Sequence, residues 1–445
     1  GQQVMKMTQI IWYRSQTAPA KPDAAASPAS PWEDHDPDAA YITIAPLHLR
    51  EAFWTKLSRP IQGVMYHGWQ SLVATDSPSA YRYTNPQTQH ELKRLVKEVV
   101  EPLGPTLLQV PGKQGDVAFL ESFTSQMLAQ RGAYGWSGGW GADAYLILHY
   151  AGLQPEVVYE ETIQRRGLAG YRVLVLADCD VLPRGVVEKI KAFQKGGGLV
   201  IGDDHLAPAI KPDLTLAAYQ RTKKADVDKI ALLERAARLR EGLAKRYTGA
   251  LQSSNPEVVP HLRRTGGADY VFVVNDRREY GSYVGQHGLV MENGLPADAE
   301  LTLRRKSGFV YDLVAGRQVA AQAKANQLRF SVQLGPCDGR VFLVSDRAIA
   351  AVKIAGPRNA KPGGSWAATI TIEDAENRPI SAVVPLRVDV FDPEGRAAEF
   401  SGYYGAANGR LELRLDLAAN DVPGLWEVRV RELASGKSAS GYFRL

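Results

Sequence analysis

The sequence predicts a multidomain protein in which α/β units with parallel strands precede two all-β units. Strand-like apolar runs alternate with amphipathic helical patterns up to about residue 211, which is the rhythm of parallel sheets. From about residue 255, alternating apolar and polar runs are separated by Gly, Asn and Pro turns, as in β-sandwiches. The length of 445 residues allows about three domains at roughly 150 residues each, and 45% hydrophobic residues is ordinary for a globular protein.

Charge and hydropathy exclude several classes of partner. The net charge is only +5 and the Lys and Arg residues are scattered, which argues against nucleic acid and anionic membranes as partners. No segment reaches the ~18 continuous apolar residues of a membrane span. The opening run 3–14 reads as a strand rather than a signal peptide, so we expect a partial or processed chain.

The two cysteines, Cys179 and Cys337, lie more than 150 residues apart, each beside a strand-like run. This spacing provides neither a disulfide framework nor a structural zinc site, so we expect both to fill cores. No metal and no cofactor is predicted.

The first unit, residues 1–112, has a βαβα pattern. Its strand-like runs are 3–14, 41–47 and 60–69. An amphipathic helix is predicted over 85–104, where apolar residues recur at helical spacing until Pro102 and Gly104. A Pro-, Ala-, Ser- and Asp-rich loop, 17–38, is long enough to be either functional or flexible.

The second unit, residues 113–211, predicts a small doubly wound α/β domain. Four strand-like runs, GDVAFLES, PEVVYEE, YRVLVLADCD and GLVIGDD, are separated by the helical patterns GADAYLILHYAGL and GVVEKIKAFQKGG. Ligands of such sheets bind at the carboxyl ends of strands, so the exits ADCD and GDDH are where a site would lie.

The rest of the chain predicts a helical bridge and two β-sandwiches. Residues 212–254 are mostly one charged helical stretch, which we expect to be a bridge that packs on a neighbouring domain; such a helix is more often a solvated face than a binding element. Residues 255–350 predict one sandwich and 351–445 predict a second of immunoglobulin-like or macroglobulin-like type.

In this order, the units resemble the C-terminal part of a clan A glycoside hydrolase of the family 42 β-galactosidase type. GVMYHGWQS (63–71) resembles the last barrel strand of that family, and YRVLVLADCDVLPRGVVEKIKAFQKGGGLVIGDD (171–204) resembles its middle domain. The resemblance covers roughly residues 1–350. It implies a partial TIM barrel over 1–112, then a flavodoxin-like trimerisation domain related in fold to class I glutamine amidotransferases, then a β-sandwich.

The final module lies outside that pattern. KPGGSWAATITIEDAENRPISAVVPLRVDVFDPEG is similar to macroglobulin-type and adhesin-type sandwiches of secreted bacterial proteins. This similarity implies an extracytoplasmic or secreted protein.

Retaining glycosidases need two carboxyl groups about 5 to 5.5 Å apart. By resemblance these come from the ends of barrel strands 4 and 7, and a chain that begins near strand 6 would lack the acid/base. If 60–69 is strand 8, then 41–49 is strand 7, and its end carries Ala45 and His48 instead of a Glu. Glu51 is a weak catalytic candidate, because its surroundings are helical and favour a first-turn residue stabilised by the helix dipole. We therefore expect this chain alone to lack the catalytic pair.

Several aromatic and polar residues are candidates for substrate contacts. By resemblance, Trp69 forms the floor under the sugar ring; the alternative is a rim Trp that packs against a loop. Tyr66 and His67 either line the barrel mouth or are satisfied core residues. Gln70 stands where the family has Arg, which puts the same substrate in doubt.

A second aromatic cluster, GAYGWSGGWGADAY (132–145), contains Trp136 and Trp140 among several glycines. It is either a sugar-stacking platform or an interface or packing loop. By resemblance it lies beside the barrel mouth of the same or an adjacent subunit.

Three further polar groups favour structural roles over chemistry. The run WEDHDPD (32–38) lacks the turning Gly of a Ca²⁺ loop, so a solvated loop is expected. Asp203, Asp204 and His205 suggest a metal or acid/base cluster, but capping or turn formation is the more common role of such residues. Cys179 lies between two Asp residues that would raise its thiol pKa, which argues against amidotransferase chemistry.

The sequence therefore predicts the C-terminal part of a glycoside hydrolase-like protein, acting on galactoside-type substrates by resemblance. This chain would supply a wall of the substrate cleft and the contacts of a homo-oligomer, together with an upstream segment of the same protein. The alternative is a non-catalytic secreted scaffold or carbohydrate-binding protein with a degenerate barrel.

Overall fold

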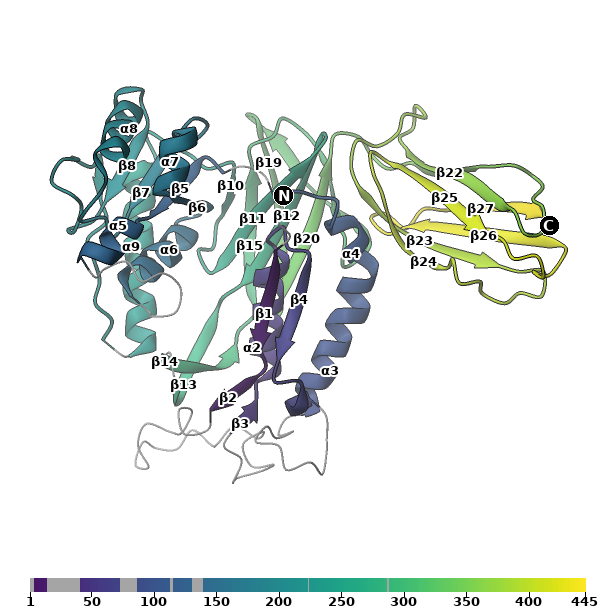
Figure 1. Cartoon of the computed structure of the whole chain (residues 1–445), viewed down its shortest axis with the longest axis horizontal. Helices are drawn as coiled ribbons and strands as arrows, with labels where there is room; N and C mark the ends of the chain where they lie inside the picture. The colour runs from purple at the N-terminus through teal and green to yellow at the C-terminus, as the bar shows by residue number, and fades with distance from the viewer. Residues whose placement is uncertain are drawn as a thin grey trace.

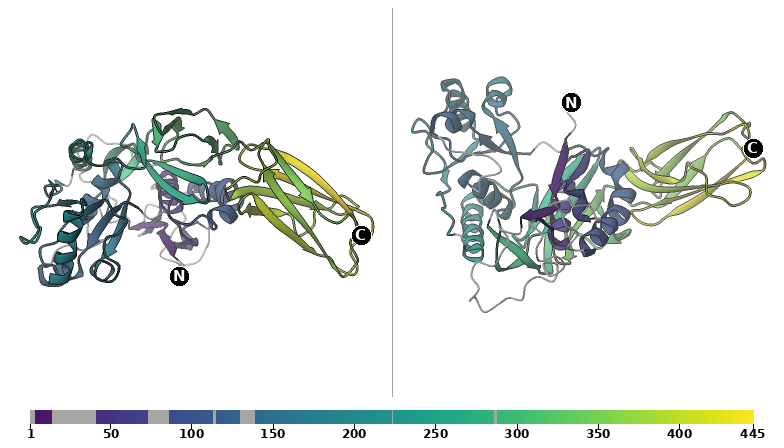
Figure 2. Two further views of the ribbon diagram at one scale, coloured as in Figure 1. Left: turned by 90° about the horizontal axis from the view of Figure 1, so that it is seen from above. Right: turned by 60° about the horizontal axis from the view of Figure 1, so that its bottom comes forward.

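The computed structural model describes residues 4–13, 41–72, 86–112, 115–129, 139–222, 224–285 and 288–445. It combines a mixed α/β part with several β-sheets. Figure 1 shows an α/β unit at one end of the molecule, central β-sheets with the N-terminal helices against them, and a second group of β-sheets at the other end. The views in Figure 2 show the same three masses in a row.

The described part of the N-terminal segment contains two small strand pairs and five helical pieces. Its strands are β1 (Met5–Gln9), β2 (Ile11–Tyr13), β3 (Tyr41–Thr43) and β4 (Gly63–His67). Its helical pieces are α2 (Pro46–Leu57), η1 (Trp69–Leu72), α3 (Pro86–Leu95), a π-helical turn over Val96–Val100 and α4 (Glu101–Leu107).

The pairing of these strands corrects the strand assignment made from the sequence. β1 pairs directly and in parallel with β4, whereas β3 pairs antiparallel with β2. The run 41–47 is therefore not a strand between them. The run 3–14 splits into β1 and β2, and β2–β3 is an excursion from the end of β1. If β4 is the last barrel strand, the strand before it is β1.

The α/β unit is built on a five-stranded parallel sheet. In sheet order the strands are β6 (Pro155–Tyr159), β5 (Val117–Glu121), β7 (Val173–Leu176), β8 (Leu199–Gly202) and β9 (Leu214–Thr215). The sequence predicted the first four, and β9 adds a strand of two residues. The central strands are apolar and buried on both faces, as parallel sheets require.

Helices cover both faces of this sheet (Figure 1). They are α5 (Phe123–Ala129), α6 (Trp140–Tyr150), α7 (Glu160–Arg166), α8 (Arg184–Lys195) and α9 (Ala225–Leu243). One core gathers side chains of α6 and α9, and a separate core gathers side chains of α7 and α8. The charged helix α9 packs in the first of these cores through buried Leu232, Ala236 and Leu239.

Two larger sheets follow in the centre of the molecule. One has the order β10 (Leu251–Ser253), β15 (Ala297–Leu303), β19 (Gln327–Leu334) and β18 (Gln322–Lys324). The other has the order β11 (Val258–Thr265), β12 (Ala268–Asn275), β20 (Gly339–Ser345), β16 (Phe309–Asp312) and β17 (Arg317–Val319). A hairpin of β13 (Arg278–Gly285) and β14 (Gly288–Gly294) projects from them. Val271, Val273, Leu301 and Phe342 belong to the core that both sheets share.

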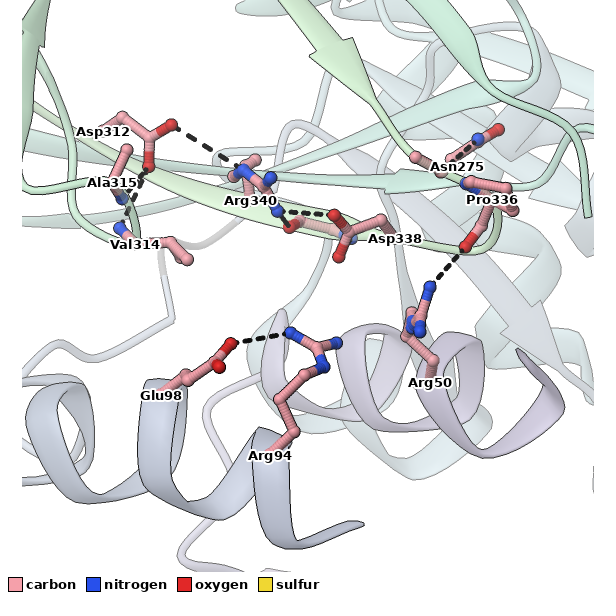
Figure 3. A network of polar contacts seen from close by, with 12 residues as sticks. Arg50, Arg94, Glu98, Asn275, Asp312, Val314, Ala315, Pro336, Asp338 and Arg340 are labelled. Atoms are coloured by element: carbon pink, nitrogen blue, oxygen red, sulfur yellow. Dashed lines mark hydrogen bonds and ion pairs between the residues drawn. The ribbon is translucent and has the colours of Figure 1, made fainter. Parts of the chain in front are cut away.

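The N-terminal helices pack on the other face of the β12 sheet. Trp54 of α2 and Leu103 of α4 share a core with Tyr270 and Phe272 of β12. Polar contacts run along the same seam in Figure 3, where Arg50 of α2 donates to the carbonyl of Pro336 at 3.1 Å. Helices α2 and α4, which belong to the same N-terminal segment as β1 and β4, thus connect this strand pair to the central sheets.

The last residues form two further sheets with one core. The first sheet has the order β21 (Ala351–Ala355), β22 (Ser365–Glu373) and β25 (Arg410–Asp416). The second has the order β24 (Gly402–Ala406), β23 (Val384–Phe391), β26 (Leu425–Glu432) and β27 (Ser438–Arg444). Trp366, Phe443 and Trp426 stack in this core. The buried hydroxyl of Tyr270 donates to the carbonyl of Val383 at 2.6 Å and ties these sheets to the centre.

Candidate functional site

The carboxyl ends of β1 and β4 lie side by side and carry polar side chains. The parallel register pairs Gln9 with His67, and the amide of Ile10 donates to the carbonyl of His67 at 3.0 Å. Gly68 follows with φ of 87°, in the left-handed region that suits glycine, and turns the chain into η1 at Trp69. Gln9 and His67 therefore end the two strands at the same edge, and Trp69 follows just beyond it.

One face of the β1–β4 pair is open and lined with methionine. Met5, Met7 and Met65 are 56%, 61% and 52% exposed. Side chains alternate across a strand, so Thr8 and Tyr66 point to the opposite, helical side. There Thr8 is buried, Tyr66 packs against a small apolar cluster, and burial raises the pKa of Tyr66 to about 12. His67, in register with exposed Gln9, belongs to the open face, whereas Tyr66 belongs to the packed one.

Trp69 is 56% exposed and borders a hollow of about 430 Å³. The other walls of this hollow include Leu72 and, from α3, His90, Leu92 and Lys93. An indole face beside a partly apolar hollow is suited to the C–H face of a pyranose ring. The side chain of Gln70 and the whole of Trp136 lie outside the described part of the chain.

Neither strand end carries a carboxylate, since residues 9–13 read QIIWY and residues 67–72 read HGWQSL. If β4 is the last barrel strand, its neighbour β1 places Gln9, rather than a residue near Ala45, at the end of the preceding strand. An amide has the shape of a carboxyl group and can donate and accept hydrogen bonds, but it cannot serve as a carboxylate nucleophile. Sequence reasoning missed Gln9 because the run 3–14 was treated as one strand.

Glu51, the sequence-based catalytic candidate, lies in a buried charged network. It is in the second turn of α2, not the first as expected, and it accepts a hydrogen bond from Arg278 of β13. Arg278 also donates to Asp276, which in addition accepts from the hydroxyl of Tyr150 at 2.5 Å. These partners belong to β13, the turn before it and α6, so the network joins elements distant in sequence and is separate from the β1–β4 edge.

The two carboxyl groups of the network have opposite pKa shifts. Burial raises the pKa of Glu51 to about 7, with Arg278 opposing and Asp276 adding to the rise. Burial alone would also raise the pKa of Asp276, but Arg278 and Lys229 outweigh it and hold that pKa below its ordinary value. Asp276 is thus the ionised member of the pair near neutral pH, and Glu51 is the member that takes up a proton as the pH falls through about 7.

This arrangement predicts a pH dependence of stability. The pKa of Glu51 is higher in the folded than in the unfolded protein, so its contribution is fully present below about pH 4.5 and is lost as the pH rises through about 7. Replacing Glu51 with Gln, which mimics the protonated acid, should flatten this part of the profile. Urea unfolding at pH 5 and pH 8 measures the change, and an unaltered pH dependence in the variant would contradict the assignment.

A second polar edge lies at the carboxyl ends of β7 and β8 in the α/β unit. Asp203 accepts hydrogen bonds from the indole of Trp140 at 2.7 Å, the amide of Asp178 at 2.7 Å and the amide of His205 at 3.0 Å. Asp204 accepts from the amide of Ala218 at 2.9 Å. Asp203, Asp204 and Trp140 are therefore engaged in organising loops.

Cys179 follows at the same edge and is fully buried. Burial, together with the carboxylates of Asp203 and Asp178, raises the pKa of its thiol well above the ordinary value. It is Asp178, with φ of 53°, that adopts the left-handed turn after β7. A buried thiol in an acidic environment resists ionisation and makes a poor nucleophile, which agrees with the sequence-based argument against amidotransferase chemistry.

The described residues contain no group of three or more His, Cys, Asp or Glu side chains placed to hold a metal ion. Within the same residues, no helix combines the length and the apolar character needed to span a bilayer.

A scan against protein-family models and a search of curated proteins each found no match. Several solved structures similar to the chain are glycoside hydrolases. Alpha-L-fucosidase isoenzyme 2 from Paenibacillus thiaminolyticus is 15% identical, with a TM-score of 0.48 over 68% of this chain and 58% of its own. The β-galactosidase from Bacillus circulans sp. alkalophilus is 13% identical, with a TM-score of 0.43 over 68% of this chain and 53% of its own. The exo-carrageenase GH42 from Bacteroides ovatus is 14% identical, with a TM-score of 0.37 over 67% and 39%. The chain thus spans less than two thirds of each.

Proposed function

We propose that this chain is the C-terminal part of a glycoside hydrolase-like protein and supplies one wall of its carbohydrate cleft. The observation that carries the proposal is the β1–β4 pair. It is parallel, covered by helices on one face, and open on the other, where Met7, Met65, Gln9 and His67 are exposed; the chain then turns at Gly68 into exposed Trp69. Parallel strands are normally covered on both faces, so this open face fits the inner wall of a barrel completed by other strands.

The proposed division of the chain follows the elements. Residues 1–112 would be the end of a (β/α)8 barrel, 113–211 a flavodoxin-like oligomerisation domain, 212–254 a helical bridge, and 255–350 and 351–445 two β-sandwiches. The order β6-β5-β7-β8-β9, which is 2-1-3-4-5 in chain order, supports the flavodoxin-like assignment. In this proposal, the whole protein is a homo-oligomer located outside the cytoplasm.

The proposed reaction is hydrolysis of an O-glycosidic bond of a galactoside, with the carboxylate pair supplied by another segment of the same protein. The ends of β1 and β4 would contribute contacts rather than acid/base chemistry. Gln9 and His67 can hydrogen-bond sugar hydroxyls, and Trp69 can stack on the ring.

One observation favours a second candidate, a carbohydrate-binding protein without catalysis. Gln9 and His67 end the two paired strands, and neither can act as the carboxylate nucleophile of a retaining enzyme. The two candidates differ in the activity of the whole encoded polypeptide on an aryl galactoside. Turnover supports the hydrolase, and binding without turnover supports the carbohydrate-binding protein.

Replacing Trp69 with alanine is expected to weaken the binding of methyl β-galactoside at least about tenfold, or about 1.4 kcal/mol, because the indole face would be lost. Calorimetric titration of the chain measures this change. The unfolding midpoint should be unchanged, since the side chain is largely exposed.

Phe123→Ala is the matched control, because Phe123 is an aromatic residue of α5 that is 61% exposed. This variant should bind as the wild type does. Undiminished affinity in Trp69→Ala, or no saturable binding by the wild type, would count against the proposed cleft.

A further inference from the structure

A cleft of about 560 Å³ lies at the edge of the α/β unit opposite to the polar strand ends described above. Its walls include Asp116 and Tyr171, which precede β5 and β7, and Pro155, which begins β6. The facing wall is formed by Arg59, directly after α2, and His261 of β11. Three parts of the chain that are distant in sequence thus enclose one cavity of a size usual for small-molecule sites.

Arg59 is held at this cleft by two histidines. One terminal nitrogen of its guanidinium lies 3.2 Å from Nδ1 of His261, and the other lies 3.3 Å from Nε2 of His149. Burial and the charge of Arg59 lower the pKa of His149 to about 3 and that of His261 well below its ordinary value. Both rings are therefore neutral and accept from Arg59, so they position its charge without neutralising it.

A second guanidinium, that of Arg263, lies behind the first. Arg263 is 2% exposed and donates to the carbonyls of Leu107, Val110 and Arg59. Its cation also lies over the ring of Phe272, with 5.4 Å to the centroid. All of these partners are uncharged groups, so this buried cation is solvated by dipoles alone.

Neither Arg59 nor Arg263 has a carboxylate within 4.0 Å in the described part of the chain. The carboxylates on the cleft wall have other surroundings: Asp116 interacts with Tyr247 and lies 4.0 Å from Arg304, and Glu156 is exposed on β6. Charges removed from water are normally paired, because their desolvation is costly. Among the described residues, the guanidinium of Arg59 on the cleft wall and that of Arg263 behind it thus have no carboxylate in direct contact.

The remaining donors of Arg59 suit an anionic group. A guanidinium has five N–H donors, and two of them are used by the histidines. The others can form the paired hydrogen bonds with which arginine recognises carboxylate and phosphate. Arg166, in the last turn of α7, adds a second cation at the cleft wall, and Tyr171 and Tyr247 add aromatic surface.

We propose that this cleft binds a small molecule carrying a carboxylate or phosphate group, with Arg59 receiving the anionic group. Acidic sugars and sugar phosphates are examples of ligands with this size and charge. The site is independent of the β1–β4 edge, so the proposal does not depend on the carbohydrate cleft proposed above.

Calorimetric titration of the chain with inorganic phosphate, D-glucuronate and D-glucose tests the proposal. At least one of the two anions should bind at one site per chain with a millimolar or lower Kd, and neutral glucose should not bind there. Tighter binding of phosphate identifies a phosphorylated ligand, and tighter binding of glucuronate identifies a carboxylated one. Absence of saturable binding by both anions would overturn the proposal.

Variants assign the binding to Arg59. Arg59→Gln keeps an N–H donor for a histidine but removes the charge, and it should weaken anion binding at least tenfold. Arg238→Gln removes the same charge from an exposed position on α9 and should leave the Kd unchanged. Arg166→Gln alters only the cleft wall and should weaken binding severalfold even if Arg59→Gln unfolds. Affinities within twofold of wild type in both cleft variants would contradict the site.

Discussion

Replacing Lys229 with methionine is expected to lower the free energy of unfolding by about 3–5 kcal/mol, the usual cost of removing one partner from a buried ionic group. Lys229 is 8% exposed and lies 2.6 Å from a carboxylate oxygen of Glu257 and 3.5 Å from one of Asp276. It also donates to the carbonyl of Asp276 at 2.6 Å. Methionine would fill most of the volume but would leave Glu257 without the lysine cation and Asp276 with Arg278 and the hydroxyl of Tyr150.

Urea unfolding followed by circular dichroism measures this effect. Lys245→Met is the matched control, because Lys245 is an exposed lysine just after the same helix. The control should unfold within about 0.5 kcal/mol of wild type, as surface substitutions usually do. Equal unfolding midpoints in the two variants would show that the network of Glu51, Asp276, Arg278 and Lys229 does not hold α9 and α2 to the central sheets.

Replacing Trp54 with alanine should also cost about 3–5 kcal/mol, the range for removing a large buried aromatic side chain. Trp54 is 2% exposed and packs edge-to-face with Phe53, their ring centroids 5.6 Å apart. It lies so close to Gly339 of β20 that a Cβ on this glycine would be 2.4 Å from Trp54 Cγ. The indole therefore fills the contact between α2 and the β12 sheet completely.

Gly339→Ala tests the same contact from the other side. It should destabilise the protein by about 1–3 kcal/mol, because the added methyl group must displace the indole. Phe123→Ala, at an exposed aromatic residue, is the control for both variants. A loss below about 1 kcal/mol in Trp54→Ala would mean that the helices after β1 are not anchored through this residue.

Local patterns in the sequence were sufficient for the elements whose periodicity is strong. The strands around VLVL (173–176) and LVIG (199–202) are continuous apolar runs, and α8 has regular helical spacing, so all three were predicted at nearly the observed positions. The short strand β9 has only two residues and leaves no periodic signal.

Strand pairing could not be predicted in the same way. IWY and YIT pair across a long intervening segment, and nothing local distinguishes YIT in an antiparallel excursion from YIT in a barrel strand. The consequence was that Gln9 was missed. The signal that could have revealed it lies at Ile10. Along β1, exposed Met5 and Met7 occupy alternate positions on the open face, and this pattern ends at Gln9, before the buried side chain of Ile10.

The charged clusters were equally hidden from sequence reasoning, because their members are distant in the chain. Glu51 meets Arg278 across 227 positions, and Arg59 meets His261 across 202. Each residue alone is an ordinary polar residue of a helix, turn or strand. Only the packing of α2 on the central sheets brings them together and shows that Glu51 serves in a network rather than at a strand end.

The most direct test of the central claim uses the methionine methyl groups as reporters of the β1–β4 face. The chain has five methionines, and Met5, Met7 and Met65 are on that face, whereas Met127 is an exposed residue of α5. Nuclear magnetic resonance of methyl-labelled protein should show saturable shifts of Met7 and Met65 on titration with methyl β-galactoside, and no shift of Met127. Shifts at Met127 alone, or no saturable shift at any of these methyl groups, would contradict a carbohydrate cleft on this face.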